Sequence, residues 1–336
     1  MRSRRCAPSG PRGMLPAVTD DSSPLDGSSP MDDQARFEEF ARLATEQRNP
    51  RTVDLDTLEV PAILARISAE DHTVPAAVAK ELPHLARAVE LVVASFREGG
   101  RLVYVGAGTS GRLGVLDASE CPPTFGSPPD MVQGVIAGGH GALVRAVEGA
   151  EDRVEEGEQA MIERRIGPRD TVIGLAASRR TPFVVAALAK ARALGARTAY
   201  VTCTPRSEFT LDVDVAICPE VGPEVLMGST RMKAGTAQKL VLNMITTAAF
   251  VRLGKAYENM MVDLMATSEK LVERSRRTVM SVTGVDYAAA ARAIEAAGKS
   301  VKTAIVMLEL GCSRAEAEAR LQRAGGFVRA ALQGSP

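Results

Sequence analysis

The chain has 336 residues, of which 45% are hydrophobic and 24% charged, so it is long enough for one large domain and a smaller appendage. Lysine plus arginine and aspartate plus glutamate both number 41, and aromatic residues make up only 4%. This balance argues against nucleic acid or a membrane surface as a partner. The sequence contains no run of about 18 apolar residues and no signal peptide, so we expect a cytoplasmic protein.

Residue types that bind metals are few and scattered. The five cysteines include no Cys-x-x-Cys pair, and the three histidines are His72, His84 and His140. This pattern predicts neither a zinc site nor a disulfide framework, so acid–base chemistry would fall to carboxylates or lysines. Because Cys203 and Cys218 lie in apolar runs, we expect both to be buried small hydrophobes.

The first part of the chain changes character near residue 48. Residues 1–47 are rich in serine, proline, aspartate and glycine and predict a disordered leader. Apolar residues at helical spacing then predict a helix over 52–69 and a long amphipathic helix from Pro75 to the glycine pair at 99–100.

The middle of the chain alternates short apolar runs with helical stretches. The predicted strands cover 102–105, 131–137, 171–176, 198–202 and 213–217, and helices are predicted over 141–163 and 182–194. This alternation is typical of an α/β fold with a parallel sheet covered by helices on both faces. In such sheets ligands bind beyond the carboxyl ends of the strands.

The last third of the chain is predicted to be helical. A long helix is expected over 237–253, and the alanine-rich remainder has breaks at Gly284 and Gly311. The segments 287–297, 301–310, 314–324 and 327–332 indicate a small helical bundle.

Glycine- and hydroxyl-rich loops follow three of the predicted strands. Residues 106–114 read Gly-Ala-Gly-Thr-Ser-Gly-Arg-Leu-Gly and come directly after the first strand. Similar loops lie at 177–182 and 222–236. Glycines let the backbone approach a ligand and a following helix N-terminus favours negative charge, so these loops predict an anion site.

Two glutamates are candidate acid–base groups. Glu120 precedes Cys121-Pro122-Pro123, which is expected to end the helix begun after Gly111, and the negative end of the helix dipole would favour a protonated carboxyl group there. Glu148 and Glu151 are three residues apart and would share one face of a helix. Taken alone, each feature is more often typical of a solvated helix surface than of an active site.

Four segments, 106–116, 117–124, 146–152 and 228–239, closely resemble the N-acetylmuramic acid 6-phosphate etherase family of the sugar isomerase (SIS) superfamily. The resemblance extends over residues 43–332. It implies a three-layer sandwich with a five-stranded parallel sheet over 48–264, including the N-terminal helices. The same resemblance implies a small UBA-like helical module over 265–336.

The resemblance also implies a reaction that needs no cofactor. Ring opening, loss of the C2 proton and expulsion of D-lactate from C3 would be followed by addition of water. Glu120 matches the position of the acid that protonates lactate and then deprotonates water. Glu151, rather than Glu148, matches the second active-site glutamate and is assigned to the C2 proton.

Hydroxyls and one lysine are the substrate-binding residues that the resemblance implies. Ser178 and Thr181 are expected near the phosphate, with Thr109 and Ser110 nearer the sugar and Ser229, Thr230 and Lys233 from the third loop. Serine and threonine also cap helices routinely, so these hydroxyls can serve either purpose. The family usually has Ser-Gly-Arg-Thr at 178–181, whereas this chain has Arg179 in place of the glycine, which either crowds the phosphate or adds a charged contact.

Two alternative functions are consistent with the same superfamily. One is a non-enzymatic regulator that senses sugar phosphates, similar to glucokinase regulatory protein, and the other is an aldose–ketose isomerase. The presence of both Glu120 and Glu151 and the match over 117–124 favour the etherase. Because SIS domains commonly pack in pairs, the resemblance further implies a homodimer with sites near the interface.

Overall fold

The computed structural model describes residues 43–178, 181–266 and 268–334. Most of the predicted leader therefore lies outside the described residues. Of its last residues, η1 (Ala44–Glu46) is a short 3-10 helix and Thr45 is buried. Within the described parts of the chain, no helix is long and apolar enough to cross a membrane.

The five predicted strands are confirmed and form one parallel sheet. They are β1 (Leu102–Gly106), β2 (Val132–Ile136), β3 (Thr171–Leu175), β4 (Arg197–Val201) and β5 (Val215–Ile217), in the order β2-β1-β3-β4-β5. Gly106 at the end of β1 pairs with Ile136 of β2 and with Leu175 of β3. The carboxyl ends of these three strands are therefore level, and the loops that follow them leave the same edge of the sheet.

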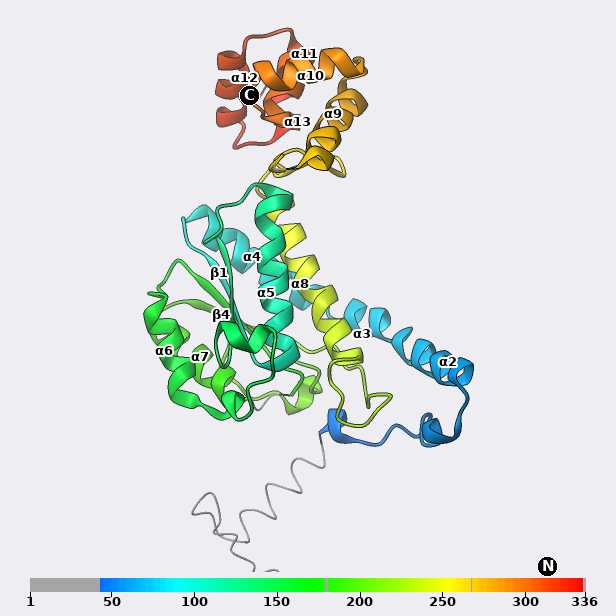
Figure 1. Ribbon diagram of the computed structural model, residues 1–336. Coiled ribbons are helices and arrows are strands. Elements are labelled where there is room, and N and C mark those ends of the chain that lie inside the picture. Colours follow the sequence, from blue (N-terminus) through cyan, green and yellow to red (C-terminus); the bar gives the residue numbers. More distant parts are fainter. Residues whose placement is uncertain (1–42, 179–180, 267, 335–336) are drawn as a thin grey trace, which may run out of the picture. The chain divides into compact units, whose positions relative to one another are not determined.

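Helices cover both faces of the sheet, so the predicted three-layer α/β sandwich is confirmed (Figure 1). Successive side chains of β1 alternate between the layers: Leu102 and Tyr104 pack with one helix layer, whereas Val103 and Val105 pack with the other. The first layer consists of α3 (Val74–Lys80), α4 (Leu82–Arg97), α5 (Gly108–Phe125) and α8 (Lys233–Val251), and the second of α6 (Val154–Glu163) and α7 (Pro182–Ala193).

The N-terminal helices are shorter than predicted. The first begins only at Val60, as α2 (Val60–Asp71), after the 3-10 turn η2 (Leu55–Thr57). The expected single helix after Pro75 is two helices, α3 and α4, separated at Glu81. Pro83 has no N–H to donate to the preceding turn, so it fits the first turn of a new helix better than the middle of a long one.

The two prolines after Cys121 do not end their helix, contrary to expectation. Helix α5 continues for a further turn to Phe125, where the amide of Gly126 bonds to the carbonyl of Pro122 at 2.9 Å. Phe125 is buried and stacks on Phe250 of α8 with a ring separation of 4.5 Å. Burial of this aromatic ring offsets the two backbone bonds that the prolines cannot make.

The C-terminal part is the predicted helical bundle. A short hairpin, β6 (Ala256–Tyr257) and β7 (Met260–Met261), precedes α9 (Glu269–Thr283), α10 (Tyr287–Ala296), α11 (Val301–Leu310), α12 (Arg314–Arg323) and α13 (Val328–Gln333). These helices share a hydrophobic cluster of their own. Lys302 of α11 is 2.7 Å from the carboxylate of Asp263, which ties the bundle to the segment after the hairpin.

Candidate functional site

The carboxyl edge of the sheet brings predicted site residues from three loops to the same part of the molecule. Thr109 and Ser110 follow β1, Ser178 and Thr181 follow β3, and Glu151 lies in the connection after β2. Because β1 is hydrogen-bonded to both β2 and β3, these loops are neighbours in space although they are up to about 70 residues apart in sequence.

Glu151 lines a pocket of about 290 Å³ at this edge. The lining of this pocket also includes Gly108 and Arg112 from the start of α5. Arg112 Nε donates a 3.1 Å hydrogen bond to the carbonyl of Leu143 in η3 (His140–Leu143). This bond fixes the Arg112 side chain of α5 against η3. The remaining lining residues are Ala107, Ala137, Ala142, Ala146, Val147, Glu148, Gly149 and Ala150. The pocket thus combines a glycine-rich helix start with carboxylates and a guanidinium group.

Glu148 and Glu151 do not share a helix, contrary to expectation. Gly149 separates them with a φ of +68°, and Glu151 lies in the 3-10 turn η4 (Ala150–Asp152), while the helix itself begins only at Val154. A Cβ at Gly138 would lie 3.0 Å from Val147 and 3.2 Å from Ala150, so this glycine allows the loop to pack closely on the end of β2. The close packing holds η4, and with it Glu151, against the sheet edge.

The starts of α5 and α8 meet beside the third predicted loop. At Gly235, a Cβ would lie 3.4 Å from the methyl carbon of Thr109 and 3.5 Å from the carbonyl oxygen of Thr230. Thr109 and Thr230 are therefore close neighbours, and Ser229 precedes Thr230 on the same half-buried loop. Thr109 and Thr230, which the sequence places in separate loops, thus lie side by side here, whereas Ser110 is buried within the first turn of α5.

Ser178 and Thr181 flank the start of α7. Both are partly buried, and the hydroxyl of Tyr200 donates a 3.1 Å hydrogen bond to the carbonyl of Ser178. Thr181 is the N-cap residue, and its carbonyl accepts from the amides of Val184 and Val185. Arg179 lies outside the described residues, so the effect of this departure from the family pattern stays a prediction.

Lys233 was expected to contact the substrate, but its ammonium group pairs with a carboxylate of the protein itself. Its side chain is buried, and its ammonium group is 2.8 Å from a carboxylate oxygen of Glu70 on α2. The carboxylate of Glu224 accepts hydrogen bonds of 2.9 Å from the amides of both Lys233 and Ala234, the first two residues of α8. This helix start is therefore already occupied by the protein's own carboxylates, Glu224 and Glu70, neither of which lies in a sequence motif that marks it as functional.

Glu120 is exposed on α5 and does not line the pocket that contains Glu151. Since α5 ends at Phe125, Glu120 is not in the final turn, and the expected influence of the helix C-terminus does not apply. It lies twelve residues beyond Gly108, which at the rise of an α-helix is a distance of about 18 Å. Eight residues of helix, about 12 Å, separate Glu120 from Arg112, the residue of α5 nearest to it in the lining of that pocket.

One histidine and two cysteines are further titratable groups of the α/β domain that we do not assign to the reaction. His140 lies in an adjoining cavity of about 420 Å³, beside Glu156 and Glu163. Cys203 and Cys218 are buried, as predicted, and burial raises the pKa of the Cys218 thiol to about 11, so that it stays protonated. In the residues that the structure describes, no group of three or more histidine, cysteine, aspartate or glutamate side chains is arranged to hold a metal ion.

Comparison with known proteins extends these observations. A family model described as the glucokinase regulatory protein N-terminal SIS domain matches residues 84–192. A protein of Salinibacter ruber named N-acetylmuramic acid 6-phosphate etherase is 61% identical over 299 residues, which are 89% of this chain and 96% of the relative. A protein of Geobacillus with the same name is 55% identical over 292 residues, 87% of this chain and 99% of the relative. Among solved structures, a phosphoheptose isomerase from Francisella tularensis is 14% identical with a TM-score of 0.43, over 56% of this chain and 98% of that one.

The predicted family is thus confirmed by similarity that spans both the α/β domain and the helical bundle. Identity of 61% over 299 residues is far above the level at which a shared fold and family are secure. The matched relatives are themselves covered almost completely. The chain therefore belongs to the N-acetylmuramic acid 6-phosphate etherase family.

Proposed function

We propose that this protein cleaves the lactyl ether of N-acetylmuramic acid 6-phosphate, giving N-acetylglucosamine 6-phosphate and D-lactate. The observation that carries the proposal is the position of Glu151 in the wall of a pocket with the glycine-rich start of α5. Elimination and addition of water require only proton transfers, so two carboxylates suffice and no cofactor is needed. We place the reaction in the cytoplasm, because the charge of a phosphorylated sugar keeps it from crossing a membrane.

The proposed steps divide the proton transfers between the two glutamates. After the sugar ring opens, Glu151 takes the proton from C2, which is acidified by the C1 aldehyde. The C3–O bond then breaks, its electron pair leaves with lactate, and Glu120 supplies the proton that lactate needs. Water adds to C3 of the unsaturated aldehyde with Glu120 now acting as base, and C2 regains a proton before the ring closes.

We propose that the phosphate binds at the start of α7 rather than at that of α8. The amides at the start of α8 are already bonded to Glu224, and Lys233 is paired with Glu70. Ser178 and Thr181 flank a helix start whose N-cap side chain makes no capping bond, and hydroxyls together with helix amides are good phosphate donors. Thr109, Ser110, Ser229 and Thr230 are left to contact the sugar or its neighbouring backbone.

The separation of the two glutamates supports the expected homodimer. We propose that Glu120 of one copy completes the site of the other, because Glu120 lies outside the pocket of its own chain, about 12 Å along α5 from Arg112 in its lining. Asp117 of α5 accepts a 2.8 Å bond from Asn243 of α8, and the residues next to this pair, Leu116 and Met244, are 52% and 40% exposed. Exposed apolar residues on adjacent helices are typical of an interface.

The family-model match to the glucokinase regulatory protein domain keeps the regulator as a second candidate. A regulator would bind the sugar phosphate without cleaving it. An aldose–ketose isomerase would move a carbonyl group and release no lactate. Both alternatives are therefore separated from the etherase by the same assay.

The deciding experiment measures lactate release from N-acetylmuramic acid 6-phosphate by the full chain. We expect turnover by the wild type and by Glu309→Ala, a control at an exposed glutamate of the helical bundle. Glu120→Ala and Glu151→Ala should each lose at least about 100-fold in kcat/KM, as is usual when a general acid or base is removed. Saturable binding of the sugar phosphate without lactate release would contradict the etherase and favour a regulator.

Mixing the two inactive variants tests the shared site. If Glu120 acts across the interface, subunit exchange between Glu120→Ala and Glu151→Ala protein creates dimers with one intact site, and about a quarter of wild-type activity returns. If both glutamates of one chain serve the same site, the mixture stays inactive. A monomer in sedimentation that retains full activity would also contradict the proposed dimer.

A further inference from the structure

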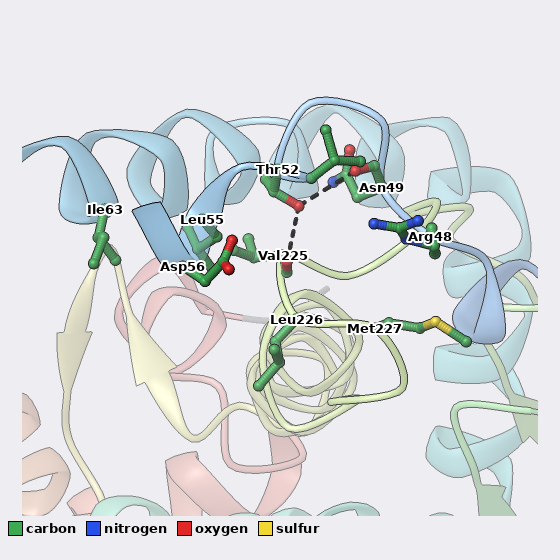
Figure 2. Close-up of a pocket in the computed structure, with 10 residues that line it drawn as sticks. Arg48, Asn49, Thr52, Leu55, Asp56, Ile63, Val225, Leu226 and Met227 are labelled. Atoms are coloured by element: carbon green, nitrogen blue, oxygen red, sulfur yellow. Dashed lines mark hydrogen bonds between the residues drawn. The ribbon is translucent and has the colours of Figure 1, made fainter. Parts of the chain in front are cut away.

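The segment formed by residues 43–57, here called the N-terminal strap, crosses the loop 222–232 that carries Ser229 and Thr230. The hydroxyl of Thr52 donates a 2.8 Å hydrogen bond to the carbonyl of Val225 (Figure 2). Asn49 donates a 3.3 Å bond to the carbonyl of Pro223, and the amide of Gly228 donates one of 3.3 Å to the carbonyl of Thr45. The strap therefore holds the backbone of this loop at three points within six residues.

Burial makes these contacts strong constraints on the loop. Thr45, Asn49 and Thr52 are each less than a tenth exposed, so their polar groups have no alternative partner in water. Of the loop's apolar side chains Val225 is buried, whereas Leu226 and Met227 are 60% and 56% exposed, so the part of the loop after Val225 has little hydrophobic anchoring of its own. Its conformation is therefore set largely by the strap on one side and by the start of α8 on the other.

An ionic chain connects these two supports. The guanidinium group of Arg51, in the strap, binds both carboxylate oxygens of Glu70, and the same carboxylate binds the ammonium group of Lys233 at 2.8 Å. Hydrogen bonding from Arg51 outweighs burial and lowers the pKa of Glu70 to about 2, so this carboxylate stays charged. Glu70 thus joins the strap to the first residue of α8, eight residues after Val225.

The strap and the loop also enclose a space of about 440 Å³ that contains none of the predicted catalytic or substrate-binding residues. Figure 2 shows Thr52 directed at the backbone of Val225, with Leu226 and Met227 further along the loop. The hydroxyl of Thr52 therefore acts on the loop backbone rather than on the predicted site residues of the pocket beside Glu151.

We propose that the N-terminal strap is a positioning element of the sugar-phosphate site, with Thr52 and Asn49 as its positioning residues. It fixes the backbone that presents Ser229 and Thr230, next to Thr109, and so sets the affinity for the ligand. This inference rests on the proposed function for the identity of the ligand. The strap takes no part in the proton transfers, so its loss weakens binding and leaves the chemical step intact.

The test compares Thr52→Val with Thr57→Val and Thr52→Ser. Valine has the shape of threonine but cannot donate to Val225, whereas serine keeps the hydroxyl. Thr57 is the matched control, because its hydroxyl bonds only to the carbonyl of Asp54 in an exposed turn of the same segment. The measurements are binding of N-acetylglucosamine 6-phosphate by calorimetry, KM and kcat for lactate release, and amide hydrogen exchange over residues 226–230.

We expect Thr52→Val to raise Kd and KM by about 10-fold, to change kcat by less than about twofold, and to speed exchange in the loop, as loss of one buried hydrogen bond predicts. Thr57→Val and Thr52→Ser should match the wild type in all three. Faster exchange with unchanged Kd, or a loss confined to kcat, would overturn the inference. If the wild type releases no lactate but Thr52→Val still weakens ligand binding, the etherase is refuted and the strap's role stands.

Discussion

Helices α7 and α8 both begin at the carboxyl edge of the sheet, after loops that contain serine and threonine, yet their first turns are used differently. The start of α8 is filled from within, since Glu224 accepts from its first two amides and Glu70 binds the Lys233 ammonium group. At the start of α7, the side chain of the N-cap residue Thr181 makes no capping hydrogen bond to the part of the helix that the structure describes, and Ser178 lies three residues before it. The comparison teaches that one sequence pattern gives a structural joint in one place and leaves a helix start without a carboxylate partner in another, according to which carboxylates the fold places beside it.

The largest expected effect comes from breaking the joint at α8. Lys233→Met leaves Glu70 buried with Arg51 as its remaining partner, so we expect a loss of about 3 kcal/mol in the free energy of unfolding, at the low end for a broken buried pair. Urea denaturation measures it. Removing both charges, in Glu70→Leu with Lys233→Met, should restore most of the loss. A loss below about 0.5 kcal/mol in the single variant would show that the joint is not a structural one.

The same joint predicts acid sensitivity. The pKa of Glu70 is lowered to about 2 by Arg51 and Lys233 in the folded protein, against an ordinary value of 4.5 when unfolded. The unfolded chain therefore binds this proton more tightly, and the stability that Glu70 contributes is complete above pH 5 and is lost as the pH falls through 4.5 toward 2. Glu70→Gln should show a shallower decline of unfolding free energy over this interval. Equal slopes in the two proteins would contradict the charged state of Glu70.

An intermediate effect is expected at the start of α7, on binding rather than on stability. Ser178→Ala combined with Thr181→Ala removes two hydroxyl donors to phosphate, which should raise KM by about 10- to 100-fold, that is about 1.5–3 kcal/mol. Thr236→Ala is the matched control in the first turn of α8, where the hydroxyl bonds to the carbonyl of Met232. The comparison fails if Thr236→Ala raises KM as much as the double variant does.

The smallest effect is expected from Glu224→Gln. Glutamine keeps the shape and one acceptor oxygen but loses the negative charge at the helix N-terminus, at a cost of about 1–2 kcal/mol in unfolding free energy. Thermal denaturation at neutral pH detects it. Inorganic phosphate should compete with substrate equally well in this variant and in the wild type, since we place the phosphate at α7. Stronger phosphate inhibition in Glu224→Gln would instead place the anion at α8, because the variant removes a negative charge that repels phosphate there.

Two predictions from local sequence patterns, the end of α5 and a helix shared by Glu148 and Glu151, are wrong for the same physical reason. Pro122 and Pro123 are strong helix terminators in isolation, but the buried stack of Phe125 on Phe250 extends α5 beyond them. Glu148 and Glu151 have helical spacing, but Gly149 between them adopts a left-handed φ of +68°, so the two glutamates do not share a helix. In both places a contact or a backbone angle outweighed the local pattern.

The sequence by itself determined the fold class, the five strands, the helical bundle and the family. Strand periodicity and glycine-rich turns are local, and the motifs over 117–124 and 228–239 are contiguous, so both are readable from the chain. Only the tertiary structure decided which of the predicted polar residues pair with the protein's own side chains and which line a pocket. It buried Lys233 against Glu70, which is 163 residues away, and placed Glu120 outside the pocket that Glu151 lines. Burial and ion pairing depend on elements distant in sequence, and no local pattern records which distant carboxylate will meet a given lysine or helix start.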